Sequence, residues 1–110
     1  MTMDATSRVS EHARRFNAAV DSGRYDEFVA GFADDAVMSF VGLPFGPFRG
    51  RDEILEAYQA QPPTSNLTVT WVEGDDRHAD ARVAYSDGGT GTMALTWSGE
   101  LVSELTVAFD

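Results

Sequence analysis

Cysteine and lysine are both absent from this 110-residue chain. Without cysteine the protein has no disulfide, no thiol nucleophile and no thiolate metal site. Without lysine it can neither form a Schiff base with a substrate nor build the phosphate-binding loop that depends on that residue. Several classes of enzyme are therefore excluded before any motif is considered.

Positive charge is also scarce. Eight arginines stand against 18 acidic residues, which gives a net charge of −10. Such an excess of acid opposes binding to nucleic-acid phosphates and to anionic lipids. No apolar run approaches the roughly 20 residues of a membrane helix, and residues 1–10 lack the apolar segment of a secretory signal. We therefore expect a cytoplasmic protein that binds neither nucleic acid nor membrane.

The apolar content of 43% is that of a globular protein, and the length suits one domain over residues 1–110. Val9, Ala13, Phe16 and Val20 recur at the spacing of one helix face. Similar patterns, bounded by glycine, paired aspartates or paired prolines, predict two more helices and a first strand. The expected helices span residues 6–22, 25–33 and 51–59, with a strand at 36–41 and an ordered loop at 42–50.

After Pro62 and Pro63 the apolar pattern changes to a period of two. Glycine-rich turns divide this region into four strands, which predicts an antiparallel meander. Helices first and a sheet afterwards indicate the α+β class. The four strands are expected at residues 66–73, 79–86, 90–97 and 100–109.

Three stretches of the sequence carry a family resemblance, and they span residues 23–37, 48–58 and 98–110. The first begins with Gly23-Arg24-Tyr25-Asp26, and the second with Phe48-Arg49-Gly50-Arg51-Asp52-Glu53-Ile54. Together they resemble the nuclear transport factor 2-like superfamily, which includes ketosteroid isomerases, limonene epoxide hydrolases and SnoaL-type polyketide cyclases. The resemblance implies a cone-shaped α+β barrel, in which three N-terminal helices pack on a strongly curved mixed or antiparallel sheet. It also implies one apolar pocket, used by enzymes and by binding proteins alike.

The sequence departs from the catalytic sets of these families. Phe40 stands at the position that matches the general-base aspartate of ketosteroid isomerases, and Phe16 at that of their oxyanion-hole tyrosine. A phenylalanine side chain can neither accept nor donate a proton. Only a supporting tyrosine is matched, by Tyr58. The last aspartate of the epoxide hydrolases is missing near Thr106, and the charges of Asp80 and Arg82 are expected to face away from the pocket.

One carboxylate is a candidate acid or base. If Ser98 and Gly99 close a two-residue hairpin, Met93 pairs with Glu104. The resemblance turns Val102, Glu104, Thr106 and Ala108 toward the pocket, where burial would raise the pKa of Glu104. The alternative is a different register with Glu104 in solvent.

The pocket is expected to be lined by residues from all parts of the chain. Tyr58 either offers its hydroxyl to a ligand or bonds to backbone in the core, and His12 either points into the pocket or lies exposed on its helix. His12 and His78 lie too far apart for a metal site. The predicted lining consists of His12, Phe16, Val20, Phe32, Met38, Phe40, Tyr58, Val83, Tyr85, Met93, Trp97 and Thr106.

These expectations define two hypotheses. In the first, the protein binds an apolar, cyclic small molecule and works as a cofactor-independent isomerase, cyclase or dehydratase, with Glu104 and Tyr58 as catalytic groups. In the second, it is a non-catalytic binding or assembly module. Neither implies a cofactor. A homodimer is expected through an apolar outer sheet face made of Leu101, Leu105, Val107 and Phe109.

Overall fold

A computed structural model describes residues 4–110 of the chain. Its first element, α1 (Ala5–Ser22), begins where the Asp4 carboxylate accepts a hydrogen bond from the Ser7 amide at 2.8 Å. It ends at Gly23, whose positive φ of 77° lets its N–H reach the Ala19 carbonyl. The helix buries one apolar stripe that includes Val9 and Phe16, as the spacing predicts.

The second helix is shorter than predicted. Helix α2 (Tyr25–Val29) stops at Val29, and strand β1 (Phe32–Phe40) already begins at Phe32. Residues 32 and 33, expected in the helix, are therefore in the strand. The reason is tertiary pairing, because Phe32 lies opposite Val102 and the Val102 amide donates to the Gly31 carbonyl at 3.0 Å.

The remaining elements follow the prediction to within a residue or two. Strand β2 (Phe48–Arg49) lies in the predicted loop and leads into α3 (Gly50–Ala60). The meander consists of β3 (Leu67–Gly74), β4 (His78–Tyr85), β5 (Thr90–Ser98) and β6 (Leu101–Phe109).

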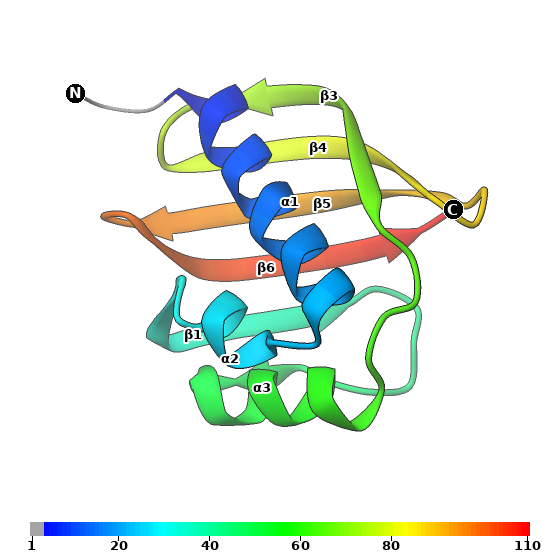
Figure 1. Cartoon of the computed structure of the whole chain (residues 1–110). Helices are drawn as coiled ribbons and strands as arrows, with labels where there is room; N and C mark the ends of the chain where they lie inside the picture. Colours follow the sequence, from blue (N-terminus) through cyan, green and yellow to red (C-terminus); the bar gives the residue numbers. More distant parts are fainter. Residues whose placement is uncertain (1–3) are drawn as a thin grey trace.

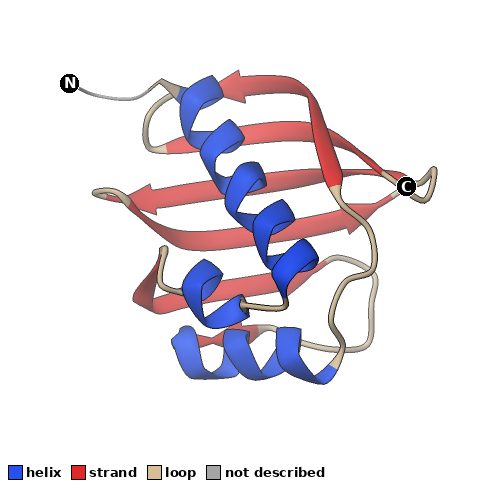
Figure 2. Cartoon of the chain, in the orientation of Figure 1, coloured by secondary structure: helices blue, strands red, loops and turns tan. Residues whose placement is uncertain are grey.

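All six strands form one mixed sheet in the order β2-β1-β6-β5-β4-β3. Strands β1 and β6 run parallel, and every other neighbouring pair is antiparallel. The helices cover a single face, with α1 crossing the sheet obliquely and α2 and α3 lying beside β1 (Figures 1 and 2). The predicted α+β fold is confirmed. No helix in residues 4–110 is long and apolar enough to span a membrane.

The register of the last hairpin differs from the prediction. Ser98 pairs with Leu101 and Trp97 with Val102, but the next pair is Thr96 with Glu104. Ser103 is therefore an extra residue, a bulge whose hydroxyl donates to the Thr96 carbonyl at 3.2 Å. One extra residue exchanges the two faces of the rest of the strand.

The bulge reverses the sheet face assigned to most of β6. Leu105 and Val107 are buried beneath the helices, so the predicted apolar patch on the outer face is wrong. Glu104 and Thr106 instead lie on the outer face, opposite Thr96 and Ala94 of β5. Val102 precedes the bulge and faces inward, as predicted.

Candidate functional site

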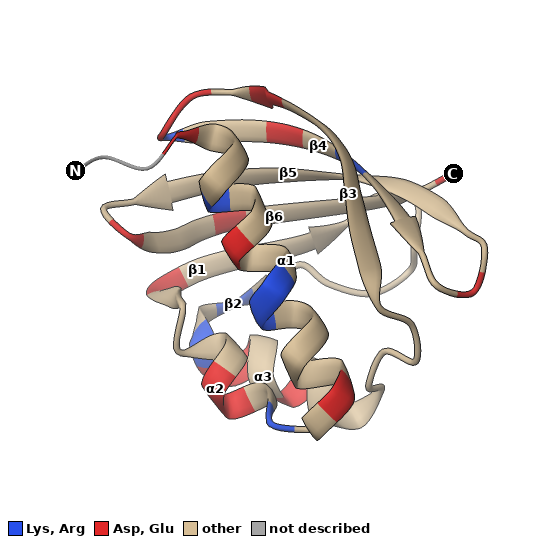
Figure 3. Ribbon diagram, turned by 45° about the horizontal axis from the view of Figure 1, so that its top comes forward, with Lys and Arg blue, Asp and Glu red and all other residues tan. Residues whose placement is uncertain are grey.

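An apolar cavity of about 590 Å³ lies between the helices and the inner face of the sheet. Its wall is built from α1, α3, β1, β5 and β6, and its mouth from the loops that follow α3 and β4. Strand β5, at the centre of the sheet, carries no charged residue (Figure 3). The apolar wall residues include Phe16, Met38, Phe40, Phe48, Met93, Leu105 and Val107.

Aromatic rings gather at one end of the cavity. Phe40 lies 5.3 Å from Phe45 and 6.5 Å from Phe109 between ring centroids. The Phe45 and Phe109 side chains remain 43% and 52% exposed. We call Phe40, Phe45, Phe48 and Phe109 the aromatic rim. A half-exposed aromatic surface beside a cavity is suited to an apolar ligand, which would cover it.

Tyr58 brings a hydroxyl into this apolar wall. It lies on α3, is 7% exposed and stacks on Tyr25 at 5.4 Å. Burial raises the pKa of its hydroxyl well above the ordinary value, and the nearby Tyr85 and Tyr25 add to the effect. Among residues 4–110 the hydroxyl forms no hydrogen bond. Tyr58 is thus a core residue that also lines the cavity, and no bond from its hydroxyl to the backbone is formed within these residues.

His12 is the second polar group in the wall. The side chain is 6% exposed, and its ring lies 5.3 Å from Phe28 and 5.9 Å from Phe32. Burial, with a smaller contribution from the Arg15 charge, lowers the pKa of His12 to about 4. The imidazole is therefore neutral near pH 7, with one donor and one acceptor nitrogen. The alternative of an exposed helix histidine is wrong.

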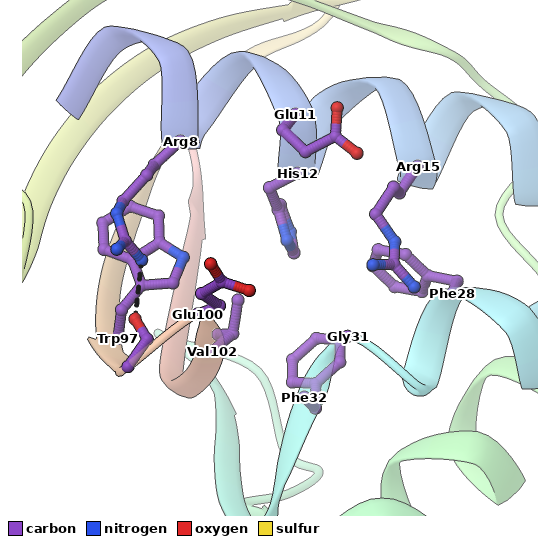
Figure 4. Close-up of a pocket in the computed structure, with 11 residues that line it drawn as sticks. Arg8, Glu11, His12, Arg15, Phe28, Gly31, Phe32, Trp97, Glu100 and Val102 are labelled. Atoms are coloured by element: carbon purple, nitrogen blue, oxygen red, sulfur yellow. Dashed lines mark hydrogen bonds between the residues drawn. The ribbon is translucent and has the colours of Figure 1, made fainter. Parts of the chain in front are cut away.

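His12 also borders a second cavity. This basic hollow, of about 450 Å³, is lined by the Arg8 and Arg15 side chains and by the β5–β6 turn (Figure 4). Among the described residues, His12 alone borders both spaces. Two residues predicted for a single pocket, Phe32 and Trp97, line the basic hollow instead.

Among residues 4–110 the only carboxylates that border the apolar cavity are Asp87 and Asp110 at its mouth, and the predicted acid or base is not one of them. Glu104 is exposed on the outer sheet face, so the expectation that it faces the pocket is wrong. Asp110 at the mouth is bound by Arg82 and by the Thr90 hydroxyl, and these hydrogen bonds lower its pKa. Asp87, also at the mouth, accepts a hydrogen bond from the Gly89 amide.

The other predicted site residues divide into three groups. Seven border the apolar cavity, namely His12, Phe16, Met38, Phe40, Tyr58, Tyr85 and Met93. Val20 and Val83 instead pack in or against the core. Thr106 is on the outer face, because it follows the bulge. As predicted, Asp80 and Arg82 lie on that outer face as well.

The sequence prediction missed several wall residues. Leu105, Val107 and Phe109 were assigned to the wrong face of the sheet. The reason is the bulge at Ser103, which no pattern in the preceding residues predicts. Phe45 and Phe48 belong to the predicted loop, where their aromatic character beside glycine and proline was the available signal. Within residues 4–110, no group of three His, Asp or Glu side chains is placed to hold a metal ion.

The fold and the cavity together define an α+β cone with an apolar cavity in its interior. The SnoaL-like domain family model matches residues 13–107, and the chain therefore belongs to this family of the nuclear transport factor 2-like superfamily. The comparison with curated proteins gave no match.

Solved structures share the same fold. A Kribbella flavida protein provisionally assigned as a ketosteroid isomerase is 25% identical, with 94% of this chain and 78% of that chain covered and a TM-score of 0.68. A provisionally assigned isomerase from Rhodopseudomonas palustris is 16% identical, with 100% and 92% covered and a TM-score of 0.79. An LEH-like epoxide hydrolase from M. tuberculosis is 13% identical, with 94% and 84% covered and a TM-score of 0.71.

Proposed function

We propose that the protein binds an apolar, cyclic small molecule that carries one hydrogen-bond acceptor, such as a ketone oxygen, in the apolar cavity. The observation that supports this most directly is the Tyr58 hydroxyl, which forms no hydrogen bond within residues 4–110 and lies in a wall that is mostly aromatic and aliphatic. Removing apolar surface from water supplies most of the binding energy in such a site. The Tyr58 hydroxyl then orients the ligand by donating to its acceptor.

A matched pair of ligands tests both parts of the proposal. 2-Acetylnaphthalene offers two fused rings and one carbonyl, whereas 2-ethylnaphthalene has the same shape without the acceptor. We expect the ketone to bind the wild type more tightly and to lose about fivefold to tenfold in affinity in Tyr58→Phe, the value of one hydrogen bond. The ethyl compound should bind both proteins equally.

The control for this experiment is Tyr25→Phe. Tyr25 stacks on Tyr58 but does not line the cavity, so its hydroxyl should not affect ketone affinity. Equal losses in the two variants, or equal affinity of the wild type for the two ligands, would show that Tyr58 donates no hydrogen bond to the ligand. Absence of binding of either ligand would contradict the proposal as a whole.

His12 supports a second candidate function, proton transfer at the carbon beside the carbonyl. In that reaction a neutral His12 nitrogen takes the proton from the C–H bond, whose electrons form the C=C bond of an enolate while the C=O π electrons move to the oxygen. The Tyr58 hydroxyl donates a hydrogen bond to that negatively charged oxygen. Return of the proton to another carbon would be an isomerase step. The low pKa of His12, about 4, makes it a weak base at pH 7, so binding is the function the site favours.

Hydrogen–deuterium exchange at the methyl group of 2-acetylnaphthalene in D₂O separates the two functions. If the protein is a catalyst, the wild type should accelerate this exchange over the rate in buffer. His12→Gln should then exchange more slowly than the wild type while binding the ketone with the same affinity. Exchange at the same rate in both proteins would leave ligand binding as the function. Neither outcome requires a cofactor.

We further propose that two copies pair through the outer sheet face, on residues other than those first predicted. The outward side chains of the central strands are small and half-buried, namely Thr92, Ala94, Thr106 and Ala108. Small side chains allow a second sheet to approach closely. Sedimentation should give twice the chain mass, and Thr106→Arg should give a monomer that still binds the ketone. A wild type that sediments as a monomer would contradict this pairing.

A further inference from the structure

The basic hollow is distinct from the apolar cavity in both position and chemistry. It lies between the first half of α1, the β5–β6 turn and the start of β1 (Figure 4). One side is apolar, formed by Phe28, Phe32 and Val102. The other side presents nitrogen donors from three consecutive turns of α1, those of Arg8, His12 and Arg15.

Arg8 is held in place with hydrogen-bonding capacity to spare. One of its terminal nitrogens donates to the Gly99 carbonyl at 2.8 Å, and its guanidinium lies 5.5 Å from the centre of the Trp97 ring. Its Nε is buried and has no hydrogen-bond partner among residues 4–110. Because this Nε has almost no accessible surface, the Arg8 donors that a ligand can reach are those of the terminal nitrogens.

Arg15 is positioned in a similar way on the opposite side of His12. Its Nη2 donates to the Glu27 carbonyl at 2.6 Å, which leaves its other guanidinium donors available. Gly31 permits this placement, since a Cβ atom there would stand 2.9 Å from the guanidinium carbon. Both arginines are therefore anchored by one backbone carbonyl each.

His12 gives independent support for a ligand. More than nine-tenths of the side chain is buried, and no described residue forms a hydrogen bond with its ring nitrogens. Its ring points into the hollow between the two arginines (Figure 4). Apart from the two bonds to the Gly99 and Glu27 carbonyls, these three side chains thus have donors for which residues 4–110 provide no acceptor.

Two carboxylates border the hollow, and neither fills it. Glu11 is engaged by Arg14 through two hydrogen bonds of 2.6 and 2.9 Å. Glu100 is exposed in the β5–β6 turn, and no ion pair with either arginine is formed. The charged groups facing His12 are therefore Arg8, Arg15, Glu11 and Glu100, of which Glu11 is already neutralised.

We propose that the basic hollow binds a small aromatic carboxylate, with its carboxylate held by Arg8, His12 and Arg15 and its ring packed against Phe28 and Phe32. Guanidinium groups bind carboxylates through charge-assisted hydrogen bonds, which are about twice as strong as neutral ones. The apolar side of the hollow accounts for the aromatic body. This site is independent of the ketone proposed for the apolar cavity.

Imidazole ¹H–¹⁵N NMR tests the proposal, because the chain has only two histidines and His78 is exposed on the other sheet face. Benzoate should shift the His12 resonances saturably and leave those of His78 unchanged. Benzamide, its neutral isostere, should bind about tenfold more weakly, since it lacks the charge that strengthens these hydrogen bonds. Equal affinity for the two compounds would overturn the assignment of a carboxylate site.

Arginine variants provide the matched comparison. Arg15→Gln and Arg8→Gln should each weaken benzoate binding by about fivefold or more. Arg24→Gln is the control, because Arg24 is 70% exposed, pairs with Glu27 and borders neither cavity, and it should have no effect. The ¹H–¹⁵N amide spectrum reports whether each variant is folded. If Arg8→Gln does not fold, Arg15→Gln alone is sufficient for the test. Equal losses in Arg24→Gln and Arg15→Gln would show that only the net charge of the protein matters, and would contradict a specific role of Arg15.

His12 borders both cavities, so one more variant must locate the benzoate. Met93→Trp fills the apolar cavity, and the benzoate response of His12 should survive it unchanged. Loss of the response in Met93→Trp would place benzoate in the apolar cavity and overturn the proposal. Glu100→Gln removes a carboxylate that competes for the arginines and should tighten benzoate binding. Weaker benzoate binding in this variant would contradict a preference of the hollow for anions.

Discussion

The two cavities that meet at His12 differ in chemistry although one helix contributes to both. Phe16 of α1 contributes an apolar ring to one cavity, while Arg8 and Arg15 contribute guanidinium groups to the other. A helix turns by about 100° per residue, so neighbours such as Arg15 and Phe16 lie on different stripes. His12 lies between these stripes and borders both spaces. A single amphipathic helix can thus divide a cone-shaped interior into two sites of opposite character.

Filling one cavity should separate the two sites most strongly. Met93 is buried at the centre of the sheet and borders only the apolar cavity. Met93→Trp should weaken 2-acetylnaphthalene binding by more than about thirtyfold, at a cost in unfolding free energy of about 1–3 kcal/mol from overpacking. Titration calorimetry and urea unfolding measure the two effects. A folded variant that binds the ketone like the wild type would contradict the location of the site.

The shared residue should make stability depend on pH. The pKa of His12 is about 4 in the folded protein and about 6.5 when unfolded, so between these values only the unfolded state takes up a proton. Stability is therefore complete above pH 6.5 and falls as the pH decreases toward 4. Between pH 7 and pH 5 the loss should be about 2 kcal/mol.

Urea unfolding of His12→Gln at pH 7 and pH 5 checks this contribution. The variant should lose about 2 kcal/mol less than the wild type over that interval. His78→Gln serves as the control, because His78 is exposed and should leave the wild-type pH dependence unchanged. If His12→Gln retains the full pH dependence, the imidazole is not held neutral by burial.

The aromatic rim should affect only the apolar site. Phe45 packs on Phe40 and Phe48 at the mouth and does not border the basic hollow. Phe45→Ala should weaken ketone binding by about threefold through lost ring contact and leave the benzoate shift of His12 intact. Stopped-flow dissociation should show a faster off-rate. An equal effect on both ligands would mean that the two sites are coupled.

The smallest effect is expected on the outer face. Glu104 is exposed and contacts neither cavity, so Glu104→Gln should change ketone affinity, benzoate affinity and unfolding free energy by no more than about 0.5 kcal/mol. The same titrations and urea curves measure it. A large loss of ketone binding would restore Glu104 as a pocket residue and contradict the bulge at Ser103.

Most of the fold could be predicted from the sequence because its signals are local. The spacing of Val9, Ala13 and Phe16, the αL position of Gly23 and the alternation in β5 each specify an element within a few residues. The end of α2 could not be predicted in this way. Phe32 continues the helical pattern of the residues before it. It is in a strand because it pairs with Val102, which lies 70 positions away in the sequence.

The site was predicted less completely for the same physical reason. Phe16 and Tyr58 were placed at the cavity by the family resemblance, and Met38 and Met93 by the strand pattern, and all four line it. After Ser103, strict alternation assigned every residue of β6 to the wrong face of the sheet. One inserted residue disturbs the strand only locally, but it exchanges the faces of all the residues that follow. The division into two cavities depends on His12 and on the exact path of the β5–β6 turn, which no local pattern encodes.

The most direct test of the central claim is a nuclear Overhauser experiment on protein labelled with ¹³C in its methionine methyl groups and saturated with 2-acetylnaphthalene. Met38 of β1 and Met93 of β5 are buried and line the cavity, with β6 between their strands. The account predicts cross-peaks from both methyl groups to the naphthalene protons, and their loss in Met93→Trp. Saturating ligand with no cross-peak to either methionine would contradict the assignment of the apolar cavity as the binding site.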